Sequence, residues 1–149
     1  MVKTALRVLV IDDDIDLLML LERKLQQQGY KVESAVSLAE AEYVLSLFKP
    51  DIVLLDINVA GEDGRQLCWK IKHGAGAAVT KVILMSALYY PTTRTLLFGA
   101  DDFIAKPFAS EFLLQKMNAQ LTDTVAEATL VVKNFMEEPV EAPVMTMVP

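Results

Sequence analysis

Three carboxylates follow the first apolar run of the chain without a break. The segment LRVLVI, residues 6–11, is followed at once by Asp12, Asp13 and Asp14. Like charges this close repel one another, and beside an apolar strand they are poorly solvated. Carboxylate oxygens are ligands that Mg²⁺ prefers, and a bound dication would remove the repulsion. The cluster therefore indicates a magnesium site that uses Asp12 and Asp13, while Asp14 caps the helix that follows.

Three further polar residues stand at the ends of other apolar runs. Asp56 ends DIVLLD, Ser86 lies near the end of KVILMSA, and Lys106 belongs to DDFIAKPF. From the residues alone, Asp56 is either only a metal ligand or a carboxylate nucleophile that takes up a phosphoryl group. A cation and a hydroxyl are what an incoming phosphoryl group needs, so Lys106 and Ser86 favour the second role.

An alternation of strands and helices must position these residues. Short β-rich runs alternate with helical patterns, and caps at Asp14 and Ser37 and stops at Gly29 and Pro50 mark helix ends. The predicted strands are 6–11, 30–35, 51–56, 81–87 and 101–108. The predicted helices are 14–29, 37–50, 65–72, 92–99 and 109–121, and a glycine-rich loop is predicted at 59–64.

The order of these elements predicts the fold class. Strands that alternate with helices form a parallel sheet with helices on both faces and right-handed crossovers. Five such units fit an α/β fold, a doubly wound (βα)5 flavodoxin-like sheet with strand order 2-1-3-4-5. In these folds the site lies beyond the carboxyl ends of the strands. We therefore expect Asp12, Asp13, Asp56, Ser86 and Lys106 to converge on one rim.

Composition argues against several classes of function. The chain has 149 residues and a net charge of −6, which disfavours direct binding of nucleic acid or of an anionic membrane. No apolar run reaches the roughly 18 residues of a membrane span, and the N-terminus shows no signal-peptide pattern. The single cysteine, Cys68, cannot form an intrachain disulfide, so we expect a cytoplasmic protein. Cys68 is interpreted as a buried structural thiol and Trp69 as a core residue.

Four motifs, in this order along the chain, resemble those of one protein family. They are VLVIDDD in the first strand, PDIVLLDINVAGEDG around Asp56, VILMSA, and GADDFIAKPF near the end. Over about residues 5–121 the chain is similar to the receiver domain of two-component response regulators, the CheY-like superfamily. Residues 1–121 are accordingly predicted to form the receiver domain. Residues 122–149 are predicted to be a tail or linker, with a short helix followed by disorder.

The resemblance implies a metal site and its ligands. Asp56 is the implied phosphoacceptor and also a ligand of the cofactor Mg²⁺. Asp13 would bind the ion directly, and Asp12 would act beside it. Asn58 would contribute its backbone carbonyl.

The resemblance also implies how the phosphoryl group is held and sensed. Ser86 and Lys106 would bind it, and Ser86 and Phe103 would form the switch pair. The peptide bond between Lys106 and Pro107 is expected to be cis, which would aim the lysine into the site.

The chain departs from the family pattern in four places. Ala60 stands where the family usually has proline, so the loop after Asp56 is expected to turn differently. Lys106 comes 20 residues after Ser86, about two fewer than is common in the family, and the deficit is assigned to helix 92–99. Phe103 lacks the hydroxyl of a tyrosine. Leu88 is apolar at a position that tunes hydrolysis, from which a slow loss of phosphate is expected.

The expected function is a phosphoaccepting signalling switch. A sensor histidine kinase or a phosphotransfer protein would pass a phosphoryl group to Asp56 with Mg²⁺. The added charge would shift the face made by helix 92–99, strand 101–108 and helix 109–121. That face would bind an output protein or a second copy of the chain as a homodimer. The domain is expected to catalyse only its own phosphorylation and dephosphorylation, and so not to be an enzyme in the ordinary sense.

Two alternatives stay open at this point. The first is a receiver-like interaction module that works without phosphorylation. The second is a phosphatase with an aspartyl nucleophile, which would also place an aspartate at a strand end. That class needs a second acid two residues later, where this chain has Asn58, and it needs a cap domain.

Overall fold

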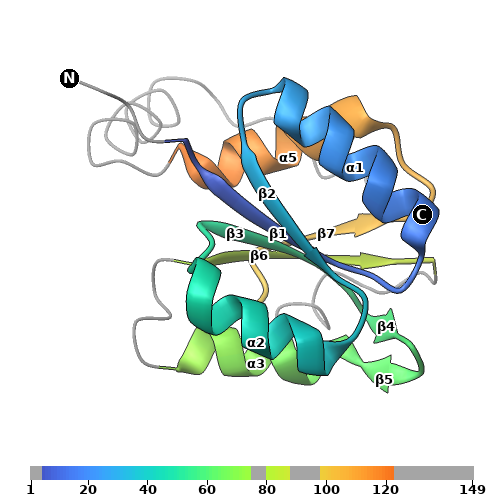
Figure 1. Cartoon of the computed structure of the whole chain (residues 1–149), viewed down its shortest axis with the longest axis vertical. Coiled ribbons are helices and arrows are strands. Elements are labelled where there is room, and N and C mark those ends of the chain that lie inside the picture. Colours follow the sequence, from blue (N-terminus) through green and yellow to red (C-terminus); the bar gives the residue numbers. More distant parts are fainter. Residues whose placement is uncertain (1–4, 75–79, 88–97, 123–149) are drawn as a thin grey trace, which may run out of the picture.

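A parallel five-stranded sheet with helices on both faces forms the framework of the described part of the chain (Figure 1). The structure is a computed structural model, and it describes residues 5–74, 80–87 and 98–122. Its elements are β1 (Arg7–Ile11), α1 (Ile15–Gln27), β2 (Lys31–Ala35), α2 (Leu38–Phe48), β3 (Ile52–Asp56), β4 (Asn58–Val59), β5 (Glu62–Asp63), α3 (Gly64–His73), β6 (Lys81–Ser86), β7 (Asp102–Ala105) and α5 (Ser110–Leu121).

The order of the strands confirms the predicted fold class. The sheet runs β2-β1-β3-β6-β7, and each neighbouring pair is parallel. With the short β4–β5 pair set apart, this is the predicted order 2-1-3-4-5 of a doubly wound flavodoxin-like sheet. The prediction of a loop at 59–64 was wrong in part, because β4 and β5 form an antiparallel hairpin there.

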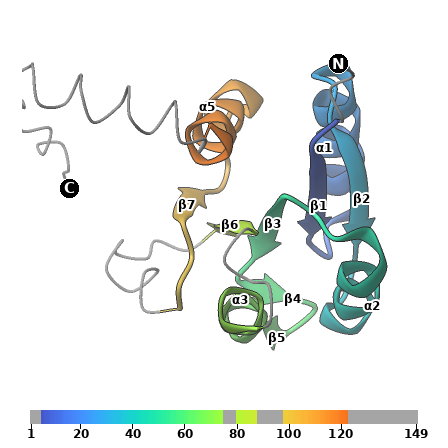
Figure 2. The same ribbon diagram turned by 90° about the vertical axis from the view of Figure 1, so that its left-hand side faces the viewer.

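Two apolar layers hold the helices against the sheet. Helices α1 and α5 cover one face, and α2 and α3 cover the other (Figures 1 and 2). Along β1, Val8 and Val10 pack toward the first pair of helices, whereas Leu9 and Ile11 pack toward the second. Because both faces are covered, the central strands are apolar without alternation, and every residue of β3 is buried. The predicted site residues therefore follow strands that are fixed from both sides.

Local caps set the ends of the helices. The backbone N–H of Leu17 donates to Asp14 Oδ1 at 3.2 Å, so Asp14 is the N-cap of α1 as predicted. The N–H of Glu40 donates to Ser37 Oγ at 3.1 Å at the start of α2. Gly29 adopts a left-handed φ of 94° after α1, which glycine does without strain. Helix α2 ends at Phe48, before the predicted end of 37–50.

Two predicted elements fall mostly on residues outside the described ranges, and Leu88, to which a slow loss of phosphate was assigned, lies wholly outside them. Of the predicted helix 92–99, only residues 98 and 99 are described, and they form a turn. Of the predicted tail 122–149, only residue 122 is described. Among the described residues no helix is both long enough and apolar enough to cross a membrane.

Candidate functional site

The predicted site residues meet at one rim of the sheet. Asp12 and Asp13 directly follow β1, Asp56 is the last residue of β3, Ser86 is the last residue of β6, and Lys106 directly follows β7. Because these strands are parallel, all of their carboxyl ends lie at the same edge. Asp12, Asp56 and Ser86 are buried polar residues, with 1 %, 8 % and 4 % of their surface exposed. Asp13 is exposed.

Three carboxylates at this rim form a cluster that fits a hard divalent cation. Asp12, Asp13 and Asp56 each offer one oxygen, and these oxygens lie within 4.8 Å of one another. Oxygen ligands of this kind suit Mg²⁺, which also keeps several water molecules. Asn58 lies two residues beyond Asp56, and its N–H donates to Asp56 Oδ1 at 3.3 Å. The role of the Asn58 carbonyl as a further ligand stays a prediction.

Lys106 joins two of the carboxylates. Its Nζ lies 2.5 Å from Asp12 Oδ2 and 3.3 Å from Asp56 Oδ2. The other oxygen of Asp12 accepts a hydrogen bond from the N–H of Asp14 at 2.9 Å. Both oxygens of Asp12 are thus engaged, and this residue holds the lysine toward Asp56. The bond between Lys106 and Pro107 is cis, the isomer that the family resemblance implied.

The charges at the rim favour binding of a cation. Burial raises the pKa of Asp56 above its ordinary value, and the charge of Asp12 raises it further, against the opposing effect of Lys106. Burial alone would lower the pKa of Lys106, but its hydrogen bond to Asp12 and the charges of both carboxylates raise it. Lys106 is therefore a cation at neutral pH, and the carboxylates still outnumber it.

The β4–β5 hairpin explains why proline is absent from the loop after Asp56. Ala60 and Gly61 have φ values of 51° and 85°, the left-handed signs of a type I′ turn. Proline is fixed near −65° and could not occupy the position of Ala60 in this turn. The side chain of Asn58 supports the turn, because its Oδ1 accepts a hydrogen bond from Gly61 N–H at 3.1 Å.

Gly64 is a site residue that the sequence reasoning missed. It is the first residue of α3, and its N–H donates to the carbonyl of Ile57 at 2.6 Å. A Cβ atom at this position would lie 2.2 Å from the backbone oxygen of Asp56. Only glycine lets α3 begin this close to the phosphoacceptor candidate. The prediction placed Gly64 at the end of the loop 59–64, directly before the predicted helix 65–72, so the only available signal was a glycine at the junction of the two.

The two predicted switch residues lie on neighbouring strands. Ser86 accepts a hydrogen bond at its carbonyl from Lys106 N–H at 2.8 Å, which fixes the end of β6 to the residue after β7. Phe103 pairs in register with Leu84 and packs partly buried against the core layer beneath α2 and α3. Their switch role stays a prediction.

An apolar hollow of about 450 Å³ adjoins the rim. It lies between α1 and the start of α5, and Lys106 forms part of its wall. Ile15, Met19 and Leu20, all on α1, are each at least half exposed. Of these three, only Leu20 lines the hollow. Besides Lys106, the lining residues are Asp14, Leu17, Leu20, Leu21, Ala87, Pro107, Phe108 and Ser110.

Comparison with known proteins gives one consistent family. Residues 8–118 match the family model described as the response regulator receiver domain. The chain is 31 % identical over 126 residues to the DNA-binding dual master transcriptional regulator RpaA of Synechocystis, covering 82 % of this chain and 52 % of RpaA. It is 32 % identical to the virulence transcriptional regulatory protein PhoP of Salmonella typhimurium, covering 76 % and 51 %. The chain thus spans about half the length of the curated relatives it matches.

Solved structures agree with the family match. A putative response regulator from Chloroflexus aurantiacus is 26 % identical, with a TM-score of 0.74 over 80 % of this chain and 99 % of that one. The beryllofluoride-activated receiver domain of RstA from Klebsiella pneumoniae is 28 % identical, with a TM-score of 0.69 over 77 % and 97 %.

Proposed function

This chain belongs to the response regulator receiver family, and on that basis we propose that it accepts a phosphoryl group on Asp56 in a two-component phosphorelay. The observation that carries the proposal is the position of Lys106. Its ammonium group contacts Asp56 and Asp12, beside a carboxylate cluster suited to Mg²⁺. Receiver domains bind Mg²⁺ at such an acidic pocket. When bound, the ion supplies charge neutralisation for the incoming phosphoryl group.

The proposed step is an in-line transfer from a phosphohistidine. An oxygen of Asp56 forms a bond to phosphorus while the bond between phosphorus and the imidazole nitrogen of the donor breaks. The imidazole leaves with the electron pair and takes a proton from solvent. Lys106 neutralises charge on the transferred group, and the hydroxyl of Ser86 hydrogen-bonds to it. We propose no turnover of an external substrate beyond this transfer and its hydrolysis.

The donor would be a sensor histidine kinase or a phosphotransfer protein. The apolar hollow beside Lys106, together with the exposed Ile15, Met19 and Leu20 of α1, is suited to an apolar surface that brings a phosphohistidine to Asp56. The proposal keeps the cytoplasmic setting expected from the sequence.

The response would pass through β7 and α5 to a protein partner or to a second copy of the chain. Phe112 of α5 is half exposed and available to such a partner. RpaA is described as DNA-binding, but that description belongs to a protein about twice as long. We propose that the receiver itself does not touch nucleic acid, in keeping with its net charge of −6.

A phosphatase mechanism is less well supported by the site. It needs an acid two residues after Asp56, and Asn58 occupies that position. The backbone N–H of Asn58 and its side-chain Oδ1 are both used locally, toward Asp56 and Gly61.

The test uses a small phosphodonor and the whole chain. Incubation with acetyl phosphate and Mg²⁺, followed by intact-mass measurement, should show one added phosphoryl group, and chelation of Mg²⁺ should abolish it. Asp56→Asn should show none, while Asp16→Asn, a matched loss of an exposed carboxylate on α1, should react as the wild type does. No adduct on the wild type, or an equal adduct on Asp56→Asn, would overturn the proposal. Multiple turnover of a small phosphoester would favour the phosphatase instead.

A further inference from the structure

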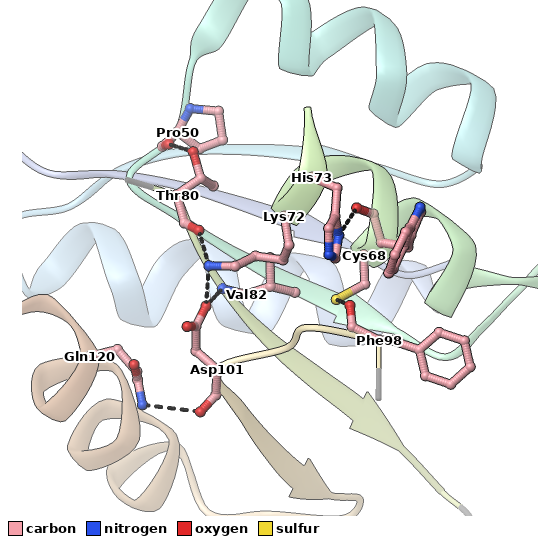
Figure 3. A network of polar contacts seen from close by, with 10 residues as sticks. Pro50, Cys68, Lys72, His73, Thr80, Val82, Phe98, Asp101 and Gln120 are labelled. Atoms are coloured by element: carbon pink, nitrogen blue, oxygen red, sulfur yellow. Dashed lines mark hydrogen bonds and ion pairs between the residues drawn. The ribbon is translucent and has the colours of Figure 1, made fainter. Parts of the chain in front are cut away.

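A second polar network lies at the amino ends of the strands, at the end of the sheet opposite the rim that holds Asp56 (Figure 3). It joins Lys72 of α3, the start of β6, and Asp101, the residue before β7. We propose that Lys72 and Asp101 are positioning residues for Lys106, acting through the register of β7. This inference rests on the proposed function, because phosphoryl transfer is the step that needs Lys106 in place.

The register of β7 decides where Lys106 lies. β7 has four residues, stands at the edge of the sheet, and pairs with β6 through Asp102 opposite Ile83 and Ala105 opposite Ser86. Lys106 follows immediately. A slip of one residue moves a strand by about 3.3 Å and turns every side chain to the other face. Lys106 Nζ would then lose its contacts with Asp12 and Asp56.

Asp101, the residue before β7, forms two hydrogen bonds with Val82 of β6. Its backbone N–H donates to the carbonyl of Val82 at 2.8 Å. Its Oδ2 accepts a hydrogen bond from the N–H of Val82, also at 2.8 Å. Val82 is fully buried, so its N–H would be left without water or partner if the carboxylate moved away. One aspartate thus satisfies both backbone groups of one residue of β6, which fixes the register from the start of the strand.

Lys72 fixes the carboxylate itself. Its Nζ lies 2.8 Å from Asp101 Oδ2 and 2.8 Å from the carbonyl oxygen of Thr80, just before β6 (Figure 3). The side chains of Lys72 and Asp101 are only 13 % and 20 % exposed, so solvent screens this pair less than a surface pair. Gln120 of α5 adds a third anchor, because its Nε2 donates to the carbonyl of Asp101 at 3.3 Å.

The turn before Asp101 also lies against α3. Gly99 has a φ of 82°, and a Cβ there would come within 3.1 Å of the Cβ of Lys72. Cys68 Sγ lies 3.4 Å from the carbonyl oxygen of Phe98, and Arg65 stands over the Phe98 ring at 5.1 Å. Helix α3, whose first residue contacts Asp56, therefore also holds the chain segment that leads to Lys106.

The experiment compares two lysine-to-methionine variants. Lys72→Met removes the pair at the start of β7. The control, Lys116→Met, removes a similar ion pair with Asp102 of the same strand, with 3.1 Å between the charged atoms and 22 % and 28 % exposure. Lys72→Met should slow phosphorylation by acetyl phosphate about tenfold, because displacement of a catalytic group by about 1 Å costs one to two orders of magnitude. Its Mg²⁺ affinity, measured by calorimetry, should not fall, because Lys106 is no metal ligand and its displacement from Asp12 and Asp56 removes a competing positive charge. Lys116→Met should react at close to the wild-type rate.

A double variant separates positioning from general damage. In a Lys106→Ala background, Lys72→Met should cause no further slowing, because the residue it positions is gone. An equal slowing in both backgrounds, or a Lys72→Met rate equal to that of the control, would overturn the inference. If Lys72→Met does not fold by circular dichroism, Asp101→Asn replaces it, since an amide oxygen still accepts from Val82 N–H but no longer pairs with Lys72. A wild type that takes no phosphoryl group would instead refute the proposed function.

Discussion

The charge balance at the rim predicts that Asp56 destabilises the metal-free protein. Burial and the neighbouring Asp12 raise the pKa of Asp56, which means that the folded state disfavours its ionised form. Replacement by the neutral isostere in Asp56→Asn should therefore raise the free energy of unfolding at neutral pH when no divalent cation is present. A buried rim that carries excess negative charge has this cost as a direct consequence.

The size of the effect follows from the distances. Carboxylate oxygens within 4.8 Å of one another repel by about 3.5 kcal/mol for each pair at an effective dielectric constant of about 20. Asp12, the neighbouring charge that raises the pKa of Asp56, repels it by about this amount, and Lys106 at 3.3 Å attracts it by about 5 kcal/mol. These two charges largely cancel, so the burial of Asp56, the largest cause of its raised pKa, decides the sign. We expect Asp56→Asn to be more stable by on the order of 1 kcal/mol, with a Tm about 4 °C higher in a domain of this size.

The assay is thermal unfolding followed by circular dichroism, in EDTA and in excess Mg²⁺. In EDTA the variant should melt above the wild type. Saturating Mg²⁺, at about 100 times Kd, should stabilise the wild type by about 2.7 kcal/mol and the variant by less, so that the gap closes. Asp16→Asn, which removes one exposed charge of α1, should change Tm little in either buffer. A variant that melts below the wild type in EDTA would show that the attraction of Lys106 outweighs the repulsion, and the reasoning would be wrong.

The pH dependence of stability, compared between the wild type and Asp56→Asn, gives an independent check of the direction of the Asp56 pKa shift. The folded pKa of Asp56 lies above its unfolded value, so below the unfolded value the residue is neutral in both states and costs nothing. As pH rises from the unfolded value through the folded one, the folded state loses stability relative to Asp56→Asn. The gap in unfolding free energy between the two proteins in EDTA should therefore widen from pH 4 to pH 7.5. A gap that narrows over this range would contradict a raised pKa.

Three further predictions follow from single contacts. Gly64→Ala would place a Cβ 2.2 Å from the Asp56 carbonyl oxygen and force α3 to shift. This should lower the free energy of unfolding, measured with denaturant, by about 2 kcal/mol. An unchanged denaturation midpoint would count against the packing described. Burial, aided by the charge of Asp101, raises the pKa of Cys68 to about 12. A thiol reagent at about pH 8 should therefore label only unfolded protein. Rapid labelling under native conditions would show that the thiol is accessible. Asp14→Ala removes the N-cap of α1 and should cost about 1 kcal/mol, more than Asp16→Ala, with equal costs excluding a capping role.

The predictable parts of this molecule were those with local causes. The caps at Asp14 and Ser37 and the stop at Gly29 each depend on a few neighbouring residues, so the sequence pattern was enough to place them. The rim was predictable for a different reason. A parallel sheet brings all of its strand ends to one edge, so the order of elements alone placed Asp12 near Asp56.

The wrong and missing predictions depend on three-dimensional context. Trp69 was predicted to be a core residue but is 50 % exposed. The buried side of α3 is set by Gly64, Leu67 and Cys68, and the next residue points about 100° away from Cys68. Trp69 instead stacks on His73, with ring centroids 3.5 Å apart. The hairpin after Asp56 was missed because its turn places alanine at a left-handed φ, which no propensity favours.

Contacts at both ends of the strands, the carboxyl end and the amino end, determine the position of Lys106. At the carboxyl edge Asp12 fixes the ammonium group, and at the amino edge Asp101 fixes the strand that carries it. Neither contact would suffice alone. If β7 could slip, the backbone position of Lys106 would vary even with its ammonium group bound to Asp12. If only the strand were fixed, the long side chain of Lys106 could still adopt other rotamers. Lys72 and Asp101 lie 29 residues apart in sequence, so no local pattern could have linked them. Residues remote from the rim should therefore affect phosphoryl transfer wherever they set strand register, even where they touch no reacting atom.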